Sequence, residues 1–376
     1  MLIALLAIGT KVEIKDAWAQ SDLAGASPAI QDAFRKGMAA YRQKNYAEAL
    51  RWFQSAADQG SDSAKAMLAG MYTEGFGVPR DYARALTLYH QAADHGNPSA
   101  ETMLGLLYDT GTGVPRDLAQ AMAWYRKAAD QGHVTAEVKL AQHFFNGEGV
   151  PKDYQQALIW ARKAAEQGNA QAQAMVGFLY HGGVGTARDY AEALKWYRAA
   201  AEQGNAEAQT KLGLMYTFGE GVRENDAEAA AWYQKAADQG SSDGQVMLGG
   251  AYMHGKGVPQ DYNRAMSLFR QAADQGNAEG EYYVGVMYHD GLGVHRDYFQ
   301  ALVWLRKAAD HGFEDAKKNL AELENYIHER VPAAMQFRCT ADGAPPMWRT
   351  SEAKVAEKAY DDCLERNYKR LGVELQ

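Results

Sequence analysis

The sequence has little of several features that would place it in a common class of protein. It contains 2 cysteines and 9 prolines in 376 residues. No run of 18 or more apolar residues occurs, so the sequence predicts no transmembrane helix. The formal net charge is −8, with basic and acidic residues interleaved throughout. Nucleic-acid binders normally carry a basic stripe, so we expect no nucleic-acid partner.

The cysteines, Cys339 and Cys363, both lie near the C-terminus. Such a pair would form a disulfide in an exported protein and would remain two free thiols in a reducing cytosol. Their spacing does not suit zinc, which needs clustered Cys and His ligands. We therefore expect no metal and no cofactor, and the disulfide is a prediction that depends on export.

The first 19 residues share features with a signal peptide. Residues 1–8 are apolar, and Ala17-Trp18-Ala19 before Gln20 has the small-x-small form of a signal-peptidase site. A basic start is missing, and charged residues between 11 and 16 precede the site. A signal peptide that lost its first residues to a wrong start codon would look like this. We expect a periplasmic or secreted protein; the alternative is a cytoplasmic protein with an irregular N-terminus.

Glycine is abundant, and eight glycines form a regular ladder. One returns every 36 residues, without insertion or deletion, at Gly60, Gly96, Gly132, Gly168, Gly204, Gly240, Gly276 and Gly312. A fixed period in this range is typical of a solenoid of stacked supersecondary units. Because each unit needs only its neighbours, such an array usually offers an extended surface for a partner.

Residues 97–132 show the content of one unit. Ala100, Leu104 and Tyr108 are four residues apart and share one face of a first helix. That helix ends at Gly111, where glycine permits backbone angles closed to other residues. A second helix follows the glycine-rich loop. The unit is therefore helix, loop, helix and glycine stop.

Capping residues mark the ends of the second helices. Asp117 is an expected N-cap, and Gly132 ends the same helix in the left-handed conformation. Asp189 and Glu192 have the spacing of a capping box in a later unit. These signals predict an all-α protein, a right-handed α/α superhelical solenoid of stacked helix-turn-helix repeats. Its expected parts are a signal peptide (1–19), a linker with an N-terminal capping repeat (20–60), seven repeats (61–312), a C-terminal capping helix (313–330) and a tail (331–376).

A tryptophan recurs at one position of the second helix. The helical spacing indicates core residues rather than ligand-binding aromatics. Truncating a buried tryptophan costs about 3–5 kcal/mol, and we expect this for Trp196→Ala. The row consists of Trp52, Trp124, Trp160, Trp196, Trp232 and Trp304, with leucine at two positions.

The repeat resembles the Sel-one-like repeat family, a relative of the tetratricopeptide repeat. The resemblance rests on the pattern Ala-x3-Leu-Gly-x2-Tyr, Gly-x-Gly-Val, Asp-Tyr-x2-Ala and Trp-Tyr-x2-Ala-Ala, repeated seven times and covering residues 29–325. Departures are local, such as Ala141 for glycine and Thr186 for valine. The resemblance implies an α/α superhelix that acts as an adaptor for protein complexes. It also implies export in many bacterial members, with roles in envelope signalling or polysaccharide export.

Variable positions on the first helices predict a groove for a protein or peptide partner. They lie roughly opposite the core stripe at 100° per residue, on the side that lines the concave groove of the related tetratricopeptide fold. Exposed aromatics are common hot spots of interfaces, although some could instead pack beneath neighbouring helices or the tail. The predicted groove residues are Phe145, Phe178, His181, Leu214, Phe218, Met253, His254, Tyr282, His289 and Asp290.

Other functions have weaker support. A glycan partner in polysaccharide export is one alternative. Gly250 to Lys256 begins like a phosphate loop, but Gly257 follows where Ser or Thr is needed. Ser351-Glu352-Ala353-Lys354 matches the Ser-x2-Lys of penicillin-interacting serine enzymes without its Lys-Thr-Gly partner. The histidines lie in different repeats, too far apart to share a metal ion. We therefore predict a non-enzymatic interaction scaffold.

Overall fold

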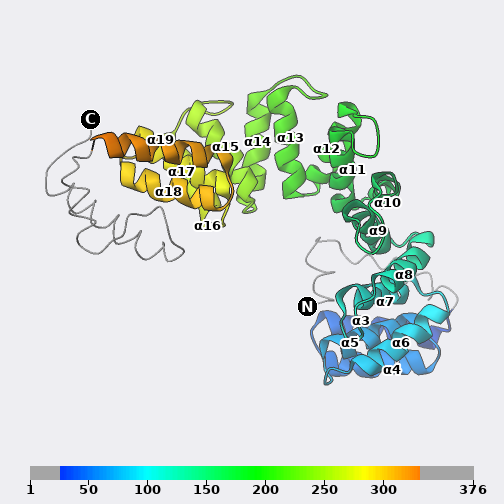
Figure 1. Ribbon diagram of the computed structural model, residues 1–376. Helices are drawn as coiled ribbons and strands as arrows, with labels where there is room; N and C mark the ends of the chain where they lie inside the picture. Colours follow the sequence, from blue (N-terminus) through cyan, green and yellow to red (C-terminus); the bar gives the residue numbers. More distant parts are fainter. Residues whose placement is uncertain (1–25, 331–376) are drawn as a thin grey trace. The chain divides into compact units, whose positions relative to one another are not determined.

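The computed structural model describes residues 26–330, and residues 1–25 and 331–376 lie outside the described part. Within residues 26–330 the chain forms 17 helices and no strand (Figure 1). The predicted all-α solenoid is therefore confirmed. The chain divides into two compact units, residues 1–200 and 201–376, and the division falls within α12 (Tyr190–Glu202). The two units are described separately.

In the first unit, each helix packs against the next helix along the chain. The odd-numbered helices are the first helices of the repeats, and the even-numbered ones are the second helices. Before α12, the unit comprises α3 (Pro28–Arg42), α4 (Tyr46–Asp58), α5 (Asp62–Glu74), α6 (Tyr82–Asp94), α7 (Pro98–Thr110), α8 (Leu118–Asp130), α9 (Val134–Asn146), α10 (Tyr154–Glu166) and α11 (Ala170–Gly182).

The second unit repeats the same arrangement and ends on a longer helix. That last helix packs against the second helix of the final repeat, which directly precedes it in the chain. The unit comprises α13 (Ala206–Phe218), α14 (Asp226–Asp238), α15 (Ser242–His254), α16 (Tyr262–Asp274), α17 (Ala278–Asp290), α18 (Tyr298–Asp310) and α19 (Glu314–Arg330).

Three pairs of neighbouring first helices contact each other more extensively than any pair of consecutive second helices among the described residues. In the first unit α5 contacts α7, and in the second unit α15 contacts both α13 and α17. Contacts between consecutive second helices of the described residues are weaker. A stack whose first helices are closer together curves toward them. We therefore call the surface formed by the first helices the inner face of each unit.

Side-chain caps explain where the helices begin. Asn97 accepts a hydrogen bond from the Ala100 amide at 2.9 Å and caps the first helix α7. Asp117 accepts from the Gln120 amide at 3.0 Å and caps the second helix α8, which confirms the N-cap prediction. Both bonds satisfy backbone donors that have no partner inside the helix. Gly132 then follows α8 with φ of +79°.

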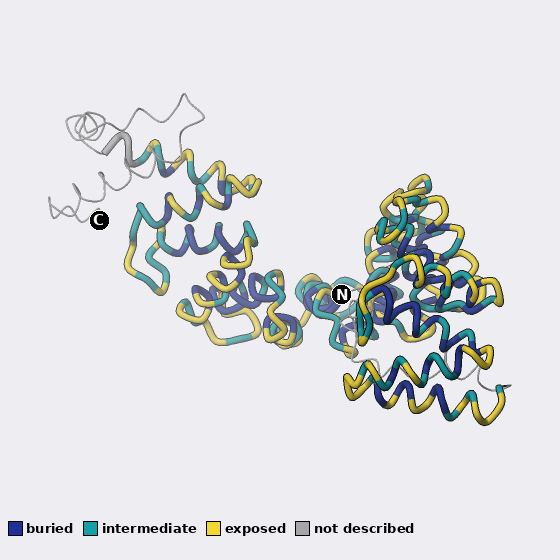
Figure 2. The backbone as a smooth tube through the Cα atoms, turned by 90° about the horizontal axis from the view of Figure 1, so that it is seen from below, coloured by how far each residue is buried: buried dark blue, intermediate teal, exposed yellow. Residues whose placement is uncertain are grey.

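In several repeats the residue after the tryptophan position is a deeply buried aromatic ring. Tyr125 and Tyr197 are almost fully buried on their second helices. Each lies against a glycine of the first helix, and a Cβ added at Gly177 would lie 2.7 Å from the Tyr197 ring. In Figure 2 buried and exposed positions alternate along the helices of the backbone tube. The glycine in the Leu-Gly motif thus makes room for an aromatic ring rather than for a turn.

The second loop glycine joins one repeat to the next. Gly185 has φ of +71°, and a Cβ there would lie 2.5 Å from the backbone carbon of Tyr154, which belongs to the preceding repeat. Only glycine tolerates both the left-handed backbone and this approach. The glycine stops differ, because Gly132 and Gly240 have nothing within 4 Å of an added Cβ.

Candidate partner-binding surface

The exposed stripe of the first helices is narrower than the sequence predicted. On α11, Gln171 and Phe178 are exposed and Met175 is half-buried, and these three follow helical spacing. Ala174 lies on the opposite edge of the predicted stripe and is buried. Packing covers that edge, which the spacing of a single helix cannot reveal. The stripe that remains forms the accessible part of the inner face.

Three aromatic side chains cluster on the first unit. Phe178 on α11 is 39% exposed, and its ring lies 5.7 Å from the ring of Phe145 on α9. Phe145 also meets Tyr154 of α10 at 5.3 Å in an edge-to-face arrangement. Phe145 and Tyr154 are half-buried, so they hold the base of the cluster while Phe178 faces solvent. The structure thus brings together two of the predicted groove residues.

The second unit exposes the most accessible large apolar side chain among the described residues. Phe218, the last residue of α13, is 68% exposed. Leu214 lies one turn earlier, is half-buried and packs on the core of this unit. Both belong to the predicted groove, and both lie on the inner face.

Two predicted groove residues are buried or covered by other side chains. Met253 is only 6% exposed and belongs to the core around Phe269, so the expectation that it faces a partner is wrong. Tyr282 is half-buried because the Phe313 ring packs on it at 4.9 Å. Asn319 of α19 donates a hydrogen bond to the Tyr282 hydroxyl at 3.1 Å. The C-terminal capping helix therefore covers Tyr282.

The histidines of the predicted groove lie apart. His254 is exposed at the end of α15. His289 pairs with its neighbour Asp290, 2.6 Å away, and both side chains are about half exposed. His181 packs edge-on against Tyr190 at 5.4 Å in the first unit. Among the described residues no group of three His, Cys, Asp or Glu is placed to hold a metal ion.

The tryptophans fall into two groups. Trp160 and Trp196 are buried, whereas Trp52, Trp124, Trp232 and Trp304 are half-exposed. Lysines cover the half-exposed rings, as Lys127 does over Trp124 at 3.9 Å. Such cation–π contacts are worth about 0.5–1 kcal/mol at exposed sites. Burial along the row is therefore uneven, and beside Trp52, Trp124 and Trp232 the aromatic ring of the following residue is the more deeply buried one.

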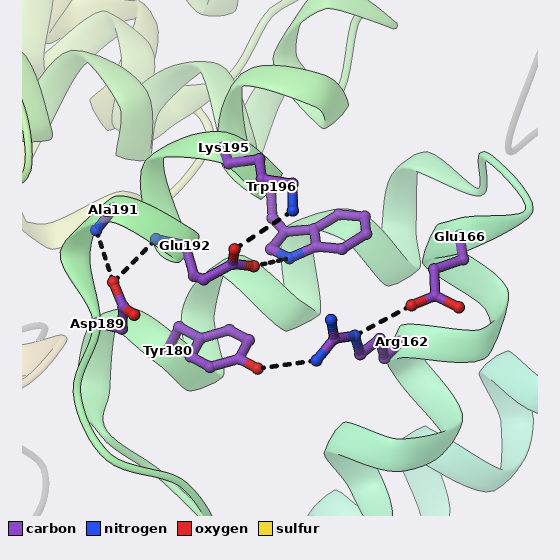
Figure 3. Close-up of polar contacts among 8 residues, drawn as sticks. All are labelled: Arg162, Glu166, Tyr180, Asp189, Ala191, Glu192, Lys195 and Trp196. Atoms are coloured by element: carbon purple, nitrogen blue, oxygen red, sulfur yellow. Dashed lines mark hydrogen bonds and ion pairs between the residues drawn. The ribbon is translucent and has the colours of Figure 1, made fainter.

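Figure 3 shows how Trp196 is held in the first unit. Its indole nitrogen donates to Glu192 at 2.9 Å. Asp189 accepts from the amides of Ala191 and Glu192 and caps α12. The Asp189 amide itself donates to the Tyr180 carbonyl, so the Glu192 carboxylate is not needed there. The expected capping box therefore does not form. Asp189 alone caps α12, and the Glu192 carboxylate instead accepts the hydrogen bond from the Trp196 indole.

Two buried glutamates have raised pKa values, as catalytic carboxylates often do. Burial raises the pKa of Glu101 and of Glu137. Gln131 donates to Glu101 and Gln167 to Glu137, each at 2.8 Å. The same link occurs in the second unit between two amides, from Gln239 to Gln209 at 2.7 Å. An uncharged amide serves equally well at this position, which indicates a structural role.

The structure also reveals a cluster that the sequence reading missed. The buried His143 ring lies 3.2 Å from the Asp109 carboxylate and 2.9 Å from the Glu148 carbonyl. Tyr125 donates to the same carboxylate at 3.3 Å. These residues lie in neighbouring repeats, and the 34 residues between Asp109 and His143 do not match the period of 36, so the sequence pattern does not pair them. With His143 only 3% exposed, the cluster joins repeats in the interior rather than facing a substrate.

The other motifs noted in the sequence form no recognisable catalytic site within residues 26–330. Gly250 lies inside the helix α15, so no loop forms where a phosphate loop would begin. Ser351 and Lys354, like Cys339 and Cys363, lie outside the described residues. A shallow hollow of about 430 Å³ lies on α16, lined by Asn263, Arg270 and Asp274 among others, and no predicted groove residue contributes to it. Among residues 26–330 no helix is long and apolar enough to cross a membrane.

Comparison with known proteins identifies the family. The Sel1 repeat model matches residues 29–61, 62–97, 98–133, 134–169, 170–205, 206–241, 242–277 and 278–313. The chain therefore belongs to the Sel1 repeat family, and the resemblance seen in the sequence is confirmed. Proteins built from these repeats generally serve as protein-interaction scaffolds, and the fold is typically non-catalytic.

The solved structures that are similar to this chain include two with more than 30% identity. One is c5321, a protective antigen of uropathogenic Escherichia coli with an SLR fold, at 34% identity and a TM-score of 0.71. The similarity covers 83% of this chain and 67% of that one. The other is a Sel1 repeat protein from Oxalobacter formigenes, at 33% identity and a TM-score of 0.60, covering 65% of this chain and 96% of that one. The comparison with curated proteins gives no match.

Proposed function

We propose that this protein is a non-catalytic scaffold that binds a protein partner on the inner face of its first unit. The observation that carries the proposal is Phe178, a large aromatic side chain that stays 39% exposed while its ring packs against the half-buried Phe145. Phe145 packs against Phe178 and is itself held by Tyr154, so little side-chain entropy would be lost on binding. A restricted aromatic anchor of this kind is typical of interface hot spots.

The proposal is tested by affinity capture from crosslinked cells. Wild type is compared with Phe145→Ala/Phe178→Ala, after circular dichroism has shown that the variant is folded. Ile159→Ala is the matched control, because Ile159 is 48% exposed on the second helix α10 of the same unit. We expect at least one protein to be lost with the double variant and retained with the control. Identical captures from all three would contradict the proposal.

We further propose that the protein acts in the bacterial periplasm, in signalling or envelope assembly. Support comes from the Ala17-Trp18-Ala19 sequence and from the presence of exported proteins in the family that the residues resemble. N-terminal sequencing of the protein from cells should give Gln20 as the first residue. A mature chain that begins upstream of Ala17, found in the soluble cytoplasmic fraction, would contradict this placement.

A further inference from the structure

A lysine stands on the accessible stripe of α9, in the first unit. Lys139 is half-buried, lies one turn before Gln142 and occupies the position that Met175 has on α11. The equivalent position holds methionine in four other repeats, at Met67, Met103, Met175 and Met247. Lysine is seldom buried unless it is paired. A half-buried lysine at this otherwise apolar position is therefore not explained by the packing of the repeat.

Lys139 has no acidic neighbour on the stripe. It forms no ion pair with any residue of the described part of the chain. Thr135, one turn earlier on α9, is uncharged. Phe145 of α9 meets Phe178 of α11, which stands three positions earlier in its repeat, and the same offset places Lys139 beside the uncharged Gln171. The ammonium group is therefore open to the carboxylate of a partner.

The equivalent lysine of the second unit has acidic neighbours. Lys211 of α13 corresponds to Lys139, and Glu207 lies one turn before it. A glutamate four residues before a lysine is a favourable pair on a helix surface. Asp243 of α15 takes the place that an uncharged glutamine has in the first unit, and it also accepts a hydrogen bond from Asn277 at 3.0 Å. Of the two lysines, Lys139 is therefore the one whose charge the stripe leaves unbalanced.

Amide side chains accompany the lysine on the stripe. Gln142 is half-buried and lies between Lys139 and Phe145 along α9, and Gln171 of α11 is exposed. Neither amide side chain forms a hydrogen bond within the described residues. A carboxamide offers both a donor and an acceptor, which matches the N–H and C=O groups of an extended backbone. A helical partner would not need these amides, because its backbone groups are already paired within the helix.

The spacing on α9 sets the spacing expected in the partner. Lys139 and Phe145 are six residues apart, which is about 9 Å along a helix. An extended chain advances about 3.3 Å per residue, so roughly two or three residues cover this distance. We propose that the partner is an extended peptide segment whose apolar side chain packs on Phe178 and whose carboxylate, about two or three residues away, pairs with Lys139. The proposal rests on the proposed function and names the chemistry of the partner on that same surface.

Selection from a phage-displayed library of random linear peptides tests the proposal with the full chain. We expect the enriched peptides to combine an apolar residue with Asp or Glu about two or three positions away. Lys139→Ala should lose the acidic preference and keep the apolar one, and Phe178→Ala should enrich neither. Lys211→Ala, at the equivalent position of the second unit, is the matched control and should reproduce the wild-type selection. Circular dichroism verifies that each variant is folded.

A charge exchange distinguishes a direct contact from a structural effect. For a synthetic peptide taken from the selection, Lys139→Glu should weaken binding about tenfold, as expected for the loss of a charge-assisted hydrogen bond. Replacing the acidic residue of that peptide with lysine should restore binding to Lys139→Glu and weaken binding to wild type. A lysine that only maintains the fold would give no such restoration, and its absence would overturn the pairing with Lys139.

The outcomes separate this inference from the proposed function. Enriched peptides that need Phe178 but show no acidic preference, or that keep it with Lys139→Ala, would overturn the role of Lys139 and leave the proposed function intact. Enrichment of no peptide, or only of peptides that bind Phe178→Ala equally well, would overturn the extended peptide as the occupant. The capture from crosslinked cells then decides the proposed function by itself.

Discussion

At the scale of single residues, two kinds of glycine carry different constraints. Gly257 has φ of +71°, and a Cβ there would lie 2.0 Å from the Asp226 carbonyl oxygen. Gly240 has φ of +82° and nothing within 4 Å. The glycine ladder in the sequence consists of residues like Gly240, which set the period. Glycines like Gly257 join one repeat to the next, and only the packed structure reveals this contact.

Alanine substitutions should separate the two constraints. Gly240→Ala places a side chain in the left-handed region and should cost about 1 kcal/mol. Gly257→Ala adds a clash with the backbone of the preceding repeat and should cost roughly 3 kcal/mol in total. Urea denaturation followed by circular dichroism checks the order. Equal midpoints for the two variants would contradict the close approach.

A half-buried histidine should make the stability depend on pH. Burial lowers the pKa of His133 from 6.5 to about 4, and its ring contacts the Thr102 hydroxyl at 2.9 Å. Between these values the unfolded chain binds a proton that the folded chain does not. The free energy of unfolding therefore falls as the pH falls through this window, by at most about 3 kcal/mol.

His133→Asn isolates this contribution. Asparagine at the equivalent Asn97 caps its helix, whereas His133 forms no side-chain cap bond. We expect the variant to lose less stability than wild type between pH 7 and pH 4.5, measured by urea unfolding at each pH. Parallel losses in the two proteins would show that His133 is already protonated in the fold or accessible to solvent.

At the scale of helices, the sequence predicted the helix pairs and their caps because these depend on local spacing. It could not predict which edge of each first helix the neighbouring repeat covers. Met253 therefore turned out to be buried and Tyr282 to be covered by α19, while Phe178 and Phe218 remain exposed. The same limit explains the tryptophans, since spacing alone does not distinguish Trp124 from the more deeply buried Tyr125.

The difference between tryptophans predicts unequal costs of truncation. Trp196 is 7% exposed and hydrogen-bonded to Glu192, so Trp196→Ala should destabilise by about 3–5 kcal/mol. Trp124 is half-exposed beneath Lys127, and Trp124→Ala should cost clearly less. Denaturation midpoints of the two variants provide the measurement. A smaller loss of stability for Trp196→Ala than for Trp124→Ala would contradict the deeper burial of Trp196.

At the scale of the whole molecule, Sel1 repeats provide two units whose inner faces differ in chemistry. The first carries the aromatic cluster around Phe178 and the uncharged Gln171, and the second carries Phe218 and, at the position of Gln171, the acidic Glu207. The family and the solenoid could be predicted from the period. The contrast between the faces could not, because it required knowing which positions stay exposed.

The most direct test of the account is site-specific photocrosslinking from the inner face of the first unit. A photoreactive residue at Gln142, one turn before Phe145 on α9, is compared with one at Ile159 on α10. We predict that Gln142 gives a discrete adduct with a protein partner in cells, that Ile159 gives none, and that Phe178→Ala abolishes the Gln142 adduct. An adduct from Ile159 alone, or a Gln142 adduct that persists without Phe178, would contradict partner binding on the inner face.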